Sequence, residues 1–281
     1  MDQALYKRLR VAAAHIRLSV IEGTHSAKSG HPGGSLSIAD TLAYLYEAEL
    51  NIDPQNPDWP SRDRLVLSKG HAAPALYGAL AYKGYFPQSE IVKLRSLDGF
   101  LQGHPDMKGT PGVDMSTGSL GQGVSAAAGM ALAAKIDGAH YRVYAILGDG
   151  EIEEGQVWEA LMFASHKRLT NLCVVIDNNG LQIDGPVDKV NSPYPIPEKC
   201  RAFGFHTLEI DGHDFDQLEA AFKEARETTD RPTAIVLKTV KGKGVSFMEN
   251  QVSWHGSAPN DEQYEQAKAE LEAALEAAQA L

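Results

Sequence analysis

Two polar motifs directly follow two apolar runs of the sequence. Asp149 lies in the GDG motif that follows residues 141–147, and Asn179 lies in the DNNG motif that ends the run 172–177. Runs of this kind, rich in β-branched residues and flanked by turn residues, predict buried strands. Ligands of open parallel sheets bind outside the carboxyl ends of the strands. The 30 positions that separate Asp149 from Asn179 suit one βαβ unit, so we expect the two side chains to converge.

These two side chains have the chemistry of a site for a hard cation. Carboxylate and amide oxygens suit Mg²⁺ or Ca²⁺, and Mg²⁺ usually shares its coordination shell with phosphate oxygens. Glycines at positions 148, 150 and 155 let the backbone approach a ligand closely, and the N-terminus of a following helix favours an anion. Either motif alone is most simply a turn, because Gly, Asp and Asn dominate turns. Together, at consecutive strand ends, they predict a site for a diphosphate and a metal ion.

The elements that must position this site are predicted to alternate along the chain. After two N-terminal helices, over residues 5–20 and 37–50, buried strands are predicted at residues 64–68, 141–147, 172–177, 206–210 and 233–238. Further helices are predicted at residues 73–83, 88–95, 123–135, 154–167, 215–227 and 261–281, and residues 101–123 are predicted to form a long ordered loop. This alternation indicates an α/β fold, a mostly parallel sheet with helices on both faces. No linker divides the chain, so we expect one domain over residues 1–281 that ends in a C-terminal helix.

Composition excludes several classes of protein. The chain has 281 residues and a net charge of −11, which argues against non-specific binding to nucleic acid. Only two cysteines occur, so a reducing, cytoplasmic setting is expected. The charged start resembles no signal peptide, and no apolar run approaches the roughly 20 residues of a membrane span. We therefore expect neither nucleic acid nor a membrane as a partner.

Six segments, in order along the chain, resemble transketolase. They are SGHPGGSLSIADTL at 29–42, LSKGHAAPALY at 67–77, GHPD at 103–106, STGSLGQG at 116–123, LGDGEIEEGQVWEA at 147–160 and WHG at 254–256. GDG followed after about 30 residues by NN is similar to the thiamine diphosphate fingerprint. The resemblance covers the N-terminal third to half of a transketolase and implies its diphosphate-binding domain, with the thiamine-diphosphate-binding fold.

The resemblance implies a defined cofactor site. Asp149, Asn179 and the backbone carbonyl of Leu181 match the ligands of the family's Mg²⁺ ion, for which Ca²⁺ or Mn²⁺ could substitute. The residues expected to bind thiamine diphosphate are His71, Gly118, Ser119, Leu120, Gly148, Asp149, Gly150, Glu154, Asn179 and His255.

Four histidines match catalytic positions of the family. His31 and His104 are expected to contact the sugar hydroxyls and the reacting oxygen, His71 the diphosphate and substrate, and His255 the cofactor phosphate and the donor carbonyl. The glycine-rich surroundings of His31 and His71 show no regular helical pattern and leave room for a ligand. The other six histidines have no such context and are expected to be structural: His15, His25, His140, His166, His206 and His213.

Four glutamates follow the GDG motif. Glu154 and Glu159 match family glutamates that link two cofactor sites across a subunit interface, although a solvated helix face explains them equally well. Glu151 and Glu153 are expected to be solvated.

The sequence departs from many transketolases at two positions. Ser119 stands where proline is common, and Lys69 stands where asparagine is common. A single lysine is most often solvated, so Lys69 is expected to face solvent rather than tune the recognition of substrate phosphate. Lys241 and Lys243 are expected in a mobile loop over the diphosphate, and Lys28 is expected to be exposed.

The family's activating glutamate comes from a pyrimidine-binding domain that has no counterpart here. We therefore expect the N-terminal subunit of a split transketolase, which transfers a two-carbon ketol unit from a ketose phosphate to an aldose phosphate. It would be active only with a separate C-terminal subunit, in an α2β2 heterotetramer with active sites at the interfaces. Pentose phosphates are the default sugars, and branched or sulfonated sugars are the alternatives.

Two other classes of function stay open. The GDG and NN motifs also occur in 1-deoxyxylulose-5-phosphate synthase and in 2-oxoacid dehydrogenase α-subunits, although these lack the combined SGHPGG, GHPD and WHG pattern. A non-catalytic cofactor-binding module is the third possibility, and it would be expected to carry degraded ligands.

Overall fold

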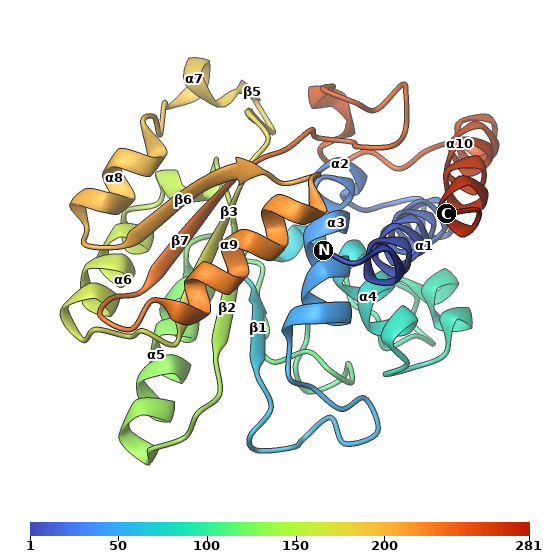
Figure 1. Ribbon diagram of the computed structural model, residues 1–281. Helices are drawn as coiled ribbons and strands as arrows, with labels where there is room; N and C mark the ends of the chain where they lie inside the picture. Colours follow the sequence, from blue (N-terminus) through green and yellow to red (C-terminus); the bar gives the residue numbers. More distant parts are fainter.

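Five strands form one parallel sheet in the order β1-β2-β3-β7-β6 (Figure 1). The computed structural model describes all residues from 1 to 281. The strands are β1 (Arg64–Leu67), β2 (Val143–Gly148), β3 (Leu172–Asn178), β6 (His206–Asp211) and β7 (Thr233–Lys238). All four neighbouring pairs are parallel, so the carboxyl ends of the strands lie along one edge. This confirms the predicted α/β fold.

Side chains of the inner strands alternate between two apolar cores. Ile146, Val175 and Leu237 contribute to the larger cluster of buried residues. Their chain neighbours Leu147, Val174 and Val236 contribute to the smaller one. Because every second residue points to the same face, and both faces are buried, the strands appear in the sequence as nearly continuous apolar runs.

Helices cover both faces of this sheet (Figure 1). The smaller core is closed by α5 (Gln122–Asp137), α6 (Gly155–His166) and α8 (Ile196–Ala202). The larger core contains residues of α1 (Gln3–Ala27), α3 (Ala39–Tyr44), α4 (Ala73–Lys83), α9 (Phe215–Glu227) and α10 (Asp261–Gln279). α10 packs along α1 on the side away from the sheet. None of the helices is both long and apolar enough to cross a lipid bilayer.

Several short elements were not predicted from the sequence. They are α2 (Pro32–Leu36), the strands β4 (Leu181–Gln182) and β5 (Gly185–Pro186), which pair with each other, and the helices α7 (Val187–Val190) and α8. Residues 88–93 form a 3-10 helix where a longer helix was expected, and residues 45–49 form a π-helical turn that extends α3.

A short helix follows His31, although the sequence there shows no regular helical pattern. Pro32 begins α2, where its fixed φ favours a helix and its missing N–H costs nothing. Gly33 is required there, because an added Cβ would lie 2.8 Å from the carbonyl oxygen of Trp254. α2 is therefore a single helical turn that packs against the segment carrying His255.

Candidate functional site

Asp149 and Asn179 lie next to each other at the carboxyl edge of the sheet, as their positions after β2 and β3 predict. Gly148 pairs with Asp177 in the sheet register, and the Asp149 N–H donates to the Asp177 carbonyl oxygen at 3.2 Å. The Asp149 carboxylate accepts from the Gly150 N–H at 2.9 Å and from the Gly180 N–H at 2.6 Å. The GDG loop and the DNNG loop are thus joined through this carboxylate.

The Asp149 carboxylate is buried, with 2% of the residue exposed. Burial, together with the negative charge of Asp177, raises the pKa of Asp149 to about 7, although the two backbone N–H donors oppose the shift. None of the 18 ion pairs of the chain involves Asp149. A cation bound beside it would supply the missing opposite charge.

The Leu181 carbonyl and Lys241 meet on the other side of this loop. Lys241 Nζ donates to the Leu181 carbonyl oxygen at 3.0 Å and lies 2.9 Å from His255 Nδ1. Only 2% of Lys241 is exposed. Burial and the nearby charge of Lys69 lower its pKa to about 8, so the side chain is mostly protonated at neutral pH. A positive charge therefore already lies beside the carbonyl that was predicted to bind a metal.

A cavity of about 280 Å³ opens beside these residues. Eight of the predicted site residues line it: His71, Gly118, Leu120, Gly148, Asp149, Gly150, Leu181 and His255. Glu151, Gln182, Ile183 and Lys241 complete the lining. Ser119, Glu154, His31, His104 and Asn179 are not part of this lining.

The four predicted catalytic histidines form one cluster with His31 at its centre. The His31 ring centroid lies 5.3 Å from that of His71, 6.2 Å from His104 and 5.7 Å from His255. The rings of His71 and His255 stack at 5.2 Å. The cluster therefore brings together four segments that are far apart in the sequence, and it lies next to the cavity.

Burial lowers the pKa of all four imidazoles below its usual value, which favours their neutral form. Burial, reinforced by Arg95, lowers the pKa of His31 to about 4, and burial next to Lys241 lowers that of His255 to about 3. Burial and the charge of Lys69 lower the pKa of His71 well below its usual value. A neutral imidazole has one donor and one acceptor nitrogen. Nδ1 of His31 is buried without a hydrogen-bond partner.

Gly118 brings the predicted cofactor loop against His104. Its φ of +146° lies in a region that side chains rarely adopt, and an added Cβ would lie 3.0 Å from the His104 ring. Gly70 approaches the same loop, because its added Cβ would be 2.7 Å from the Gly118 nitrogen. Both glycines permit close packing of the loops around the cavity.

The expectation that Glu151 is solvated was wrong. Glu151 is buried, and its carboxylate accepts hydrogen bonds from the Ser68 hydroxyl and, at 3.0 Å each, from the N–H groups of Gly121 and Gly148. Burial raises its pKa, although these hydrogen bonds oppose the shift. Glu151 therefore joins the GDG loop to the end of β1 and to the start of α5. Glu153 is only partly exposed.

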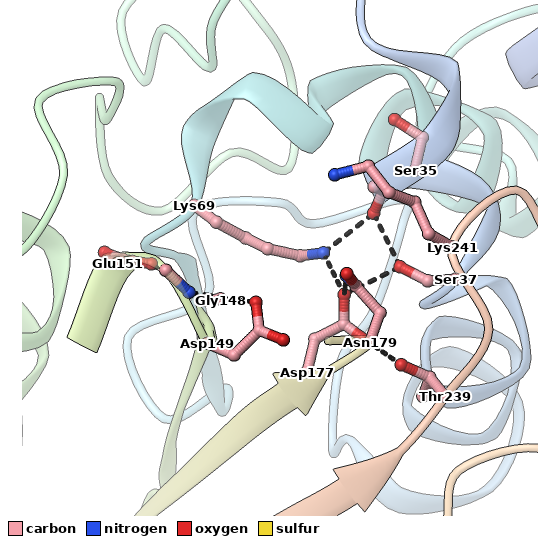
Figure 2. A network of polar contacts seen from close by, with 12 residues as sticks. Ser35, Ser37, Lys69, Gly148, Asp149, Glu151, Asp177, Asn179, Thr239 and Lys241 are labelled. Carbon is pink, nitrogen blue, oxygen red and sulfur yellow. Dashed lines mark hydrogen bonds and ion pairs between the residues drawn. The ribbon is translucent and has the colours of Figure 1, made fainter. Parts of the chain in front are cut away.

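The expectation that Lys69 faces solvent was also wrong. Only 1% of Lys69 is exposed, and its Nζ lies 2.6 Å from Oδ2 of the fully buried Asp177 (Figure 2). Burial alone would raise the pKa of Asp177, but the charge and hydrogen bond of Lys69 outweigh it and lower the pKa. Sequence reasoning missed both residues, although Asp177 begins the DNNG motif.

The remaining predicted residues lie outside the cavity. Glu154 and Glu159 are exposed on α6 or just before it. Lys28 is exposed, and Lys243 pairs with Glu249 at 3.4 Å. Of the histidines expected to be structural, His25 contacts Asp261, His206 contacts Glu224 and His213 contacts Asp40.

Comparison with known families decides the relationship. Residues 9–278 match the family model described as the transketolase thiamine diphosphate binding domain. The chain belongs to the transketolase family. Its fold agrees with solved transketolases: the enzyme from Campylobacter jejuni has a TM-score of 0.89 and 32% identity over 97% of this chain and 43% of the longer one.

Relatives fall into two groups by length. A 6-deoxy-6-sulfo-D-fructose transketolase subunit of a Clostridium species is 49% identical over 92% of this chain and 94% of its own length. An apulose-4-phosphate transketolase subunit of Phocaeicola vulgatus is 39% identical over 92% of each chain. The human transketolase is 43% identical, but the matched region is only 40% of its length. The chain thus has the length of the subunit relatives and less than half that of full-length transketolases.

Proposed function

We propose that this chain is the diphosphate-binding subunit of a two-subunit transketolase. It forms a single domain that holds thiamine diphosphate through Mg²⁺ and transfers a two-carbon ketol unit between sugars together with a C-terminal subunit. The observation that supports this most is the convergence of Asp149, Leu181, His71 and His255 on one cavity at the carboxyl edge of the sheet. The ring of His31 packs against those of His71 and His255, and that of His104 lies next to His31.

The residues around the cavity fit a metal ion and a diphosphate. Asp149, Asn179 and the Leu181 carbonyl offer a carboxylate, an amide oxygen and a backbone carbonyl, the kinds of oxygen ligand that Mg²⁺ takes. The Lys241 ammonium already bonds to one of these oxygens. The same ammonium, with His71 and the small residues Gly118 and Gly150 in the lining, leaves space and positive charge for a diphosphate.

The histidines have the chemistry that proton transfer to sugar oxygens requires. Thiamine diphosphate, when bound, supplies the electron sink for cleavage next to a carbonyl. The rings of His104 and His255 each lie next to that of His31, and burial lowers the pKa of all three, which favours the neutral form. A neutral imidazole can donate one proton and accept another in hydrogen bonds to substrate oxygens.

A partner subunit is proposed to cover the rim of the cavity and α6. Leu120 and Ile183 line the cavity but are 38% and 64% exposed, and Met162 and Phe163 on α6 are 61% and 38% exposed. Exposed apolar side chains of this kind are typical of an interface. The exposed carboxylates of Glu154 and Glu159 would be buried there, and an α2β2 heterotetramer is the proposed assembly.

Thermal unfolding with and without the cofactor tests the proposed site. A ligand that binds only the folded state stabilises it by about 2.7 kcal/mol at 100 times its Kd. We expect the Tm to rise when thiamine diphosphate and Mg²⁺ are added together, and not with Mg²⁺ alone. In Asp149→Ala the Mg²⁺-dependent part of the shift should disappear. An identical shift in the variant would contradict the assignment of Asp149.

Assays with and without a C-terminal subunit test the reaction. Ketol transfer should appear only when both subunits are present, and the donors to compare are xylulose 5-phosphate, 6-deoxy-6-sulfofructose and pyruvate. The sulfonated sugar is included because a 49% identical relative is named for it. Turnover by the isolated chain would contradict dependence on a partner, and decarboxylation of pyruvate without ketol transfer would contradict the transketolase reaction.

A further inference from the structure

The carboxylate of Asp177 accepts hydrogen bonds from four side chains that come from different parts of the fold (Figure 2). We call this group of contacts the Asp177 hub. Asp177 Oδ2 accepts from Lys69 Nζ at 2.6 Å, from Ser37 Oγ at 2.7 Å and from Asn179 Nδ2 at 2.9 Å. Its Oδ1 accepts from the hydroxyl of Thr239. The donors come from just after β1, from the segment between α2 and α3, from the end of β3 and from just after β7. None of these contacts involves solvent, because Asp177 is fully buried.

The contact with Asn179 fixes which way its amide group points. An asparagine amide has donors at nitrogen and acceptors at oxygen, and rotation by 180° exchanges them. Because Asp177 accepts from Nδ2, the oxygen Oδ1 must face the other way, where it accepts from the Leu181 N–H at 3.1 Å. We propose that Asp177, held by Lys69, is a positioning residue that orients Asn179 Oδ1 for the metal ion. This inference rests on the metal site of the proposed function.

Lys69 also connects this hub to the catalytic histidines. Its Nζ donates to the Gly34 carbonyl oxygen at 2.7 Å, and the Ser37 hydroxyl contacts the same oxygen at 3.1 Å. Gly34 lies in α2, the turn that follows His31, and an added Cβ on Gly34 would be 3.4 Å from His71 Nε2. One ammonium group therefore holds both the carboxylate behind the metal ligand and the helical turn behind His31.

That Lys69 and Asp177 form a buried ion pair, rather than an apolar contact, supports a function in positioning Asn179 over a purely structural one. The side chains of Lys69 and Asp177 are 2% and 0% exposed, and a buried pair of this kind is often no more stabilising than apolar residues of similar volume. An apolar pair could fill the space, but it could not accept the Nδ2 proton of Asn179. A variant with an apolar pair in place of Lys69 and Asp177 therefore tests whether the pair stabilises the fold or orients Asn179.

The double variant Lys69→Met/Asp177→Leu separates the two functions. Either single variant leaves one buried charge unpaired and should lower the Tm strongly, whereas the double variant should recover much of that loss. Its Mn²⁺ affinity, measured from free Mn²⁺ by electron paramagnetic resonance with saturating thiamine diphosphate, should stay 10- to 100-fold weaker than that of the wild type. The matched control is Arg62→Met/Asp114→Leu, which removes another poorly exposed pair, 2.6 Å long, near the opposite end of β1. The control should keep the wild-type Mn²⁺ affinity.

The possible outcomes are distinct. A double variant that binds Mn²⁺ as tightly as the wild type overturns the positioning function while leaving the metal site intact. A wild-type chain that retains no Mn²⁺ under these conditions overturns the proposed site, and the inference with it. If the double variant does not fold, Asp177→Asn provides the test. It keeps the shape of the side chain but replaces one acceptor oxygen with an NH2 donor, which cannot accept from Asn179 Nδ2. Wild-type Mn²⁺ affinity in Asp177→Asn would overturn the inference, and a loss of 10-fold or more would support it.

Discussion

Lys241 is the positively charged side chain that lines the candidate cofactor cavity, and no carboxylate pairs with it. Its ammonium contacts only a backbone carbonyl and His255 within the chain. Substitution by methionine therefore breaks no ion pair, although it removes a positive charge that lowers the pKa of Asp149. The same substitution removes a buried charge from the proposed diphosphate site.

We expect Lys241→Met to weaken the binding of thiamine diphosphate at least 10-fold in the presence of Mg²⁺. A charge-assisted hydrogen bond to a phosphate group in a buried site is worth about 1.5–3 kcal/mol, which corresponds to this factor or more. Isothermal titration calorimetry measures the change. Lys243→Met is the matched control, since Lys243 lies on the same loop but is half-exposed and paired with Glu249. Equal affinities in the two variants would contradict the assignment of Lys241.

Single residues were predictable where local chemistry was visible in the sequence. Asp149 and Asn179 follow apolar runs, so their position at the ends of neighbouring strands could be inferred from the sequence. Lys69 and Glu151 could not be placed in this way. Lys69 is buried because it meets Asp177, 108 positions away, and Glu151 because it meets Ser68, 83 positions away. An isolated lysine or glutamate in a sequence carries no sign of so distant a partner.

At the scale of elements, Asp40 joins four parts of the fold behind the site. From α3 it accepts two hydrogen bonds from Arg17 on α1 and one from His213 in the turn before α9. His213 accepts in turn from the Val240 N–H at 2.9 Å, and Arg17 also donates to the Lys243 carbonyl at 3.1 Å. The segment that carries Lys241 is therefore anchored at both ends to α1 and α3.

We expect this anchor to make the fold sensitive to acid. Burial alone would raise the pKa of Asp40, but the charge of Arg17 and the hydrogen bonds from His213 and Arg17 lower it well below its usual range. Because the pKa is lower in the folded state, the stabilisation is fully present above the ordinary aspartate pKa of about 4 and is lost as the pH falls further. Asp40→Asn should lower the free energy of unfolding by about 3–5 kcal/mol at pH 7, since Arg17 then lacks its counter-charge.

Urea unfolding at pH 7, 4 and 3 measures both effects. The difference between the wild type and Asp40→Asn should shrink as the pH falls below about 4. Asp58→Asn, an exposed residue, should stay within about 0.5 kcal/mol of the wild type. A difference between wild type and Asp40→Asn that is the same at all three pH values would exclude Asp40 as the titrating group.

The long elements were predictable because their apolar patterns repeat several times. The runs that became β2, β3 and β7 are uninterrupted, and α9 shows a clear helical spacing in the sequence. The five residues of α2 and the two-residue strands β4 and β5 are too short to show any period. Their conformations depend on tertiary packing, as the close contact between Gly33 and the Trp254 carbonyl shows.

At the scale of the whole molecule, the exposed apolar side chains Met162 and Phe163 on α6 allow a test of association with a second subunit. Met162→Glu should weaken the binding of a C-terminal subunit by at least 10-fold, because a charge would have to be buried in the interface. The stability of the isolated chain should change by no more than about 0.5 kcal/mol, as the side chain is 61% exposed. Sedimentation velocity of the mixed subunits measures the assembly.

The control for this surface is Val92→Glu. Val92 is also exposed, at 44%, but belongs to the 3-10 segment at residues 88–93, which packs against α1 and α4 rather than α6. This variant should assemble like the wild type. Equal loss of assembly in both variants would mean that the effect is not specific to α6.

The strand order has a consequence for how the chain is completed during synthesis on the ribosome. β1, β2 and β3 emerge in the order in which they pair, so the nascent chain can build this half of the sheet as it appears. β6 cannot follow, because its one neighbour in the sheet is β7, which begins 22 residues after β6 ends. Until β7 inserts, β3 keeps an unpaired edge of the kind that promotes aggregation. The last strand to be made therefore closes the sheet, and Lys241 and His255 reach the cavity only after that.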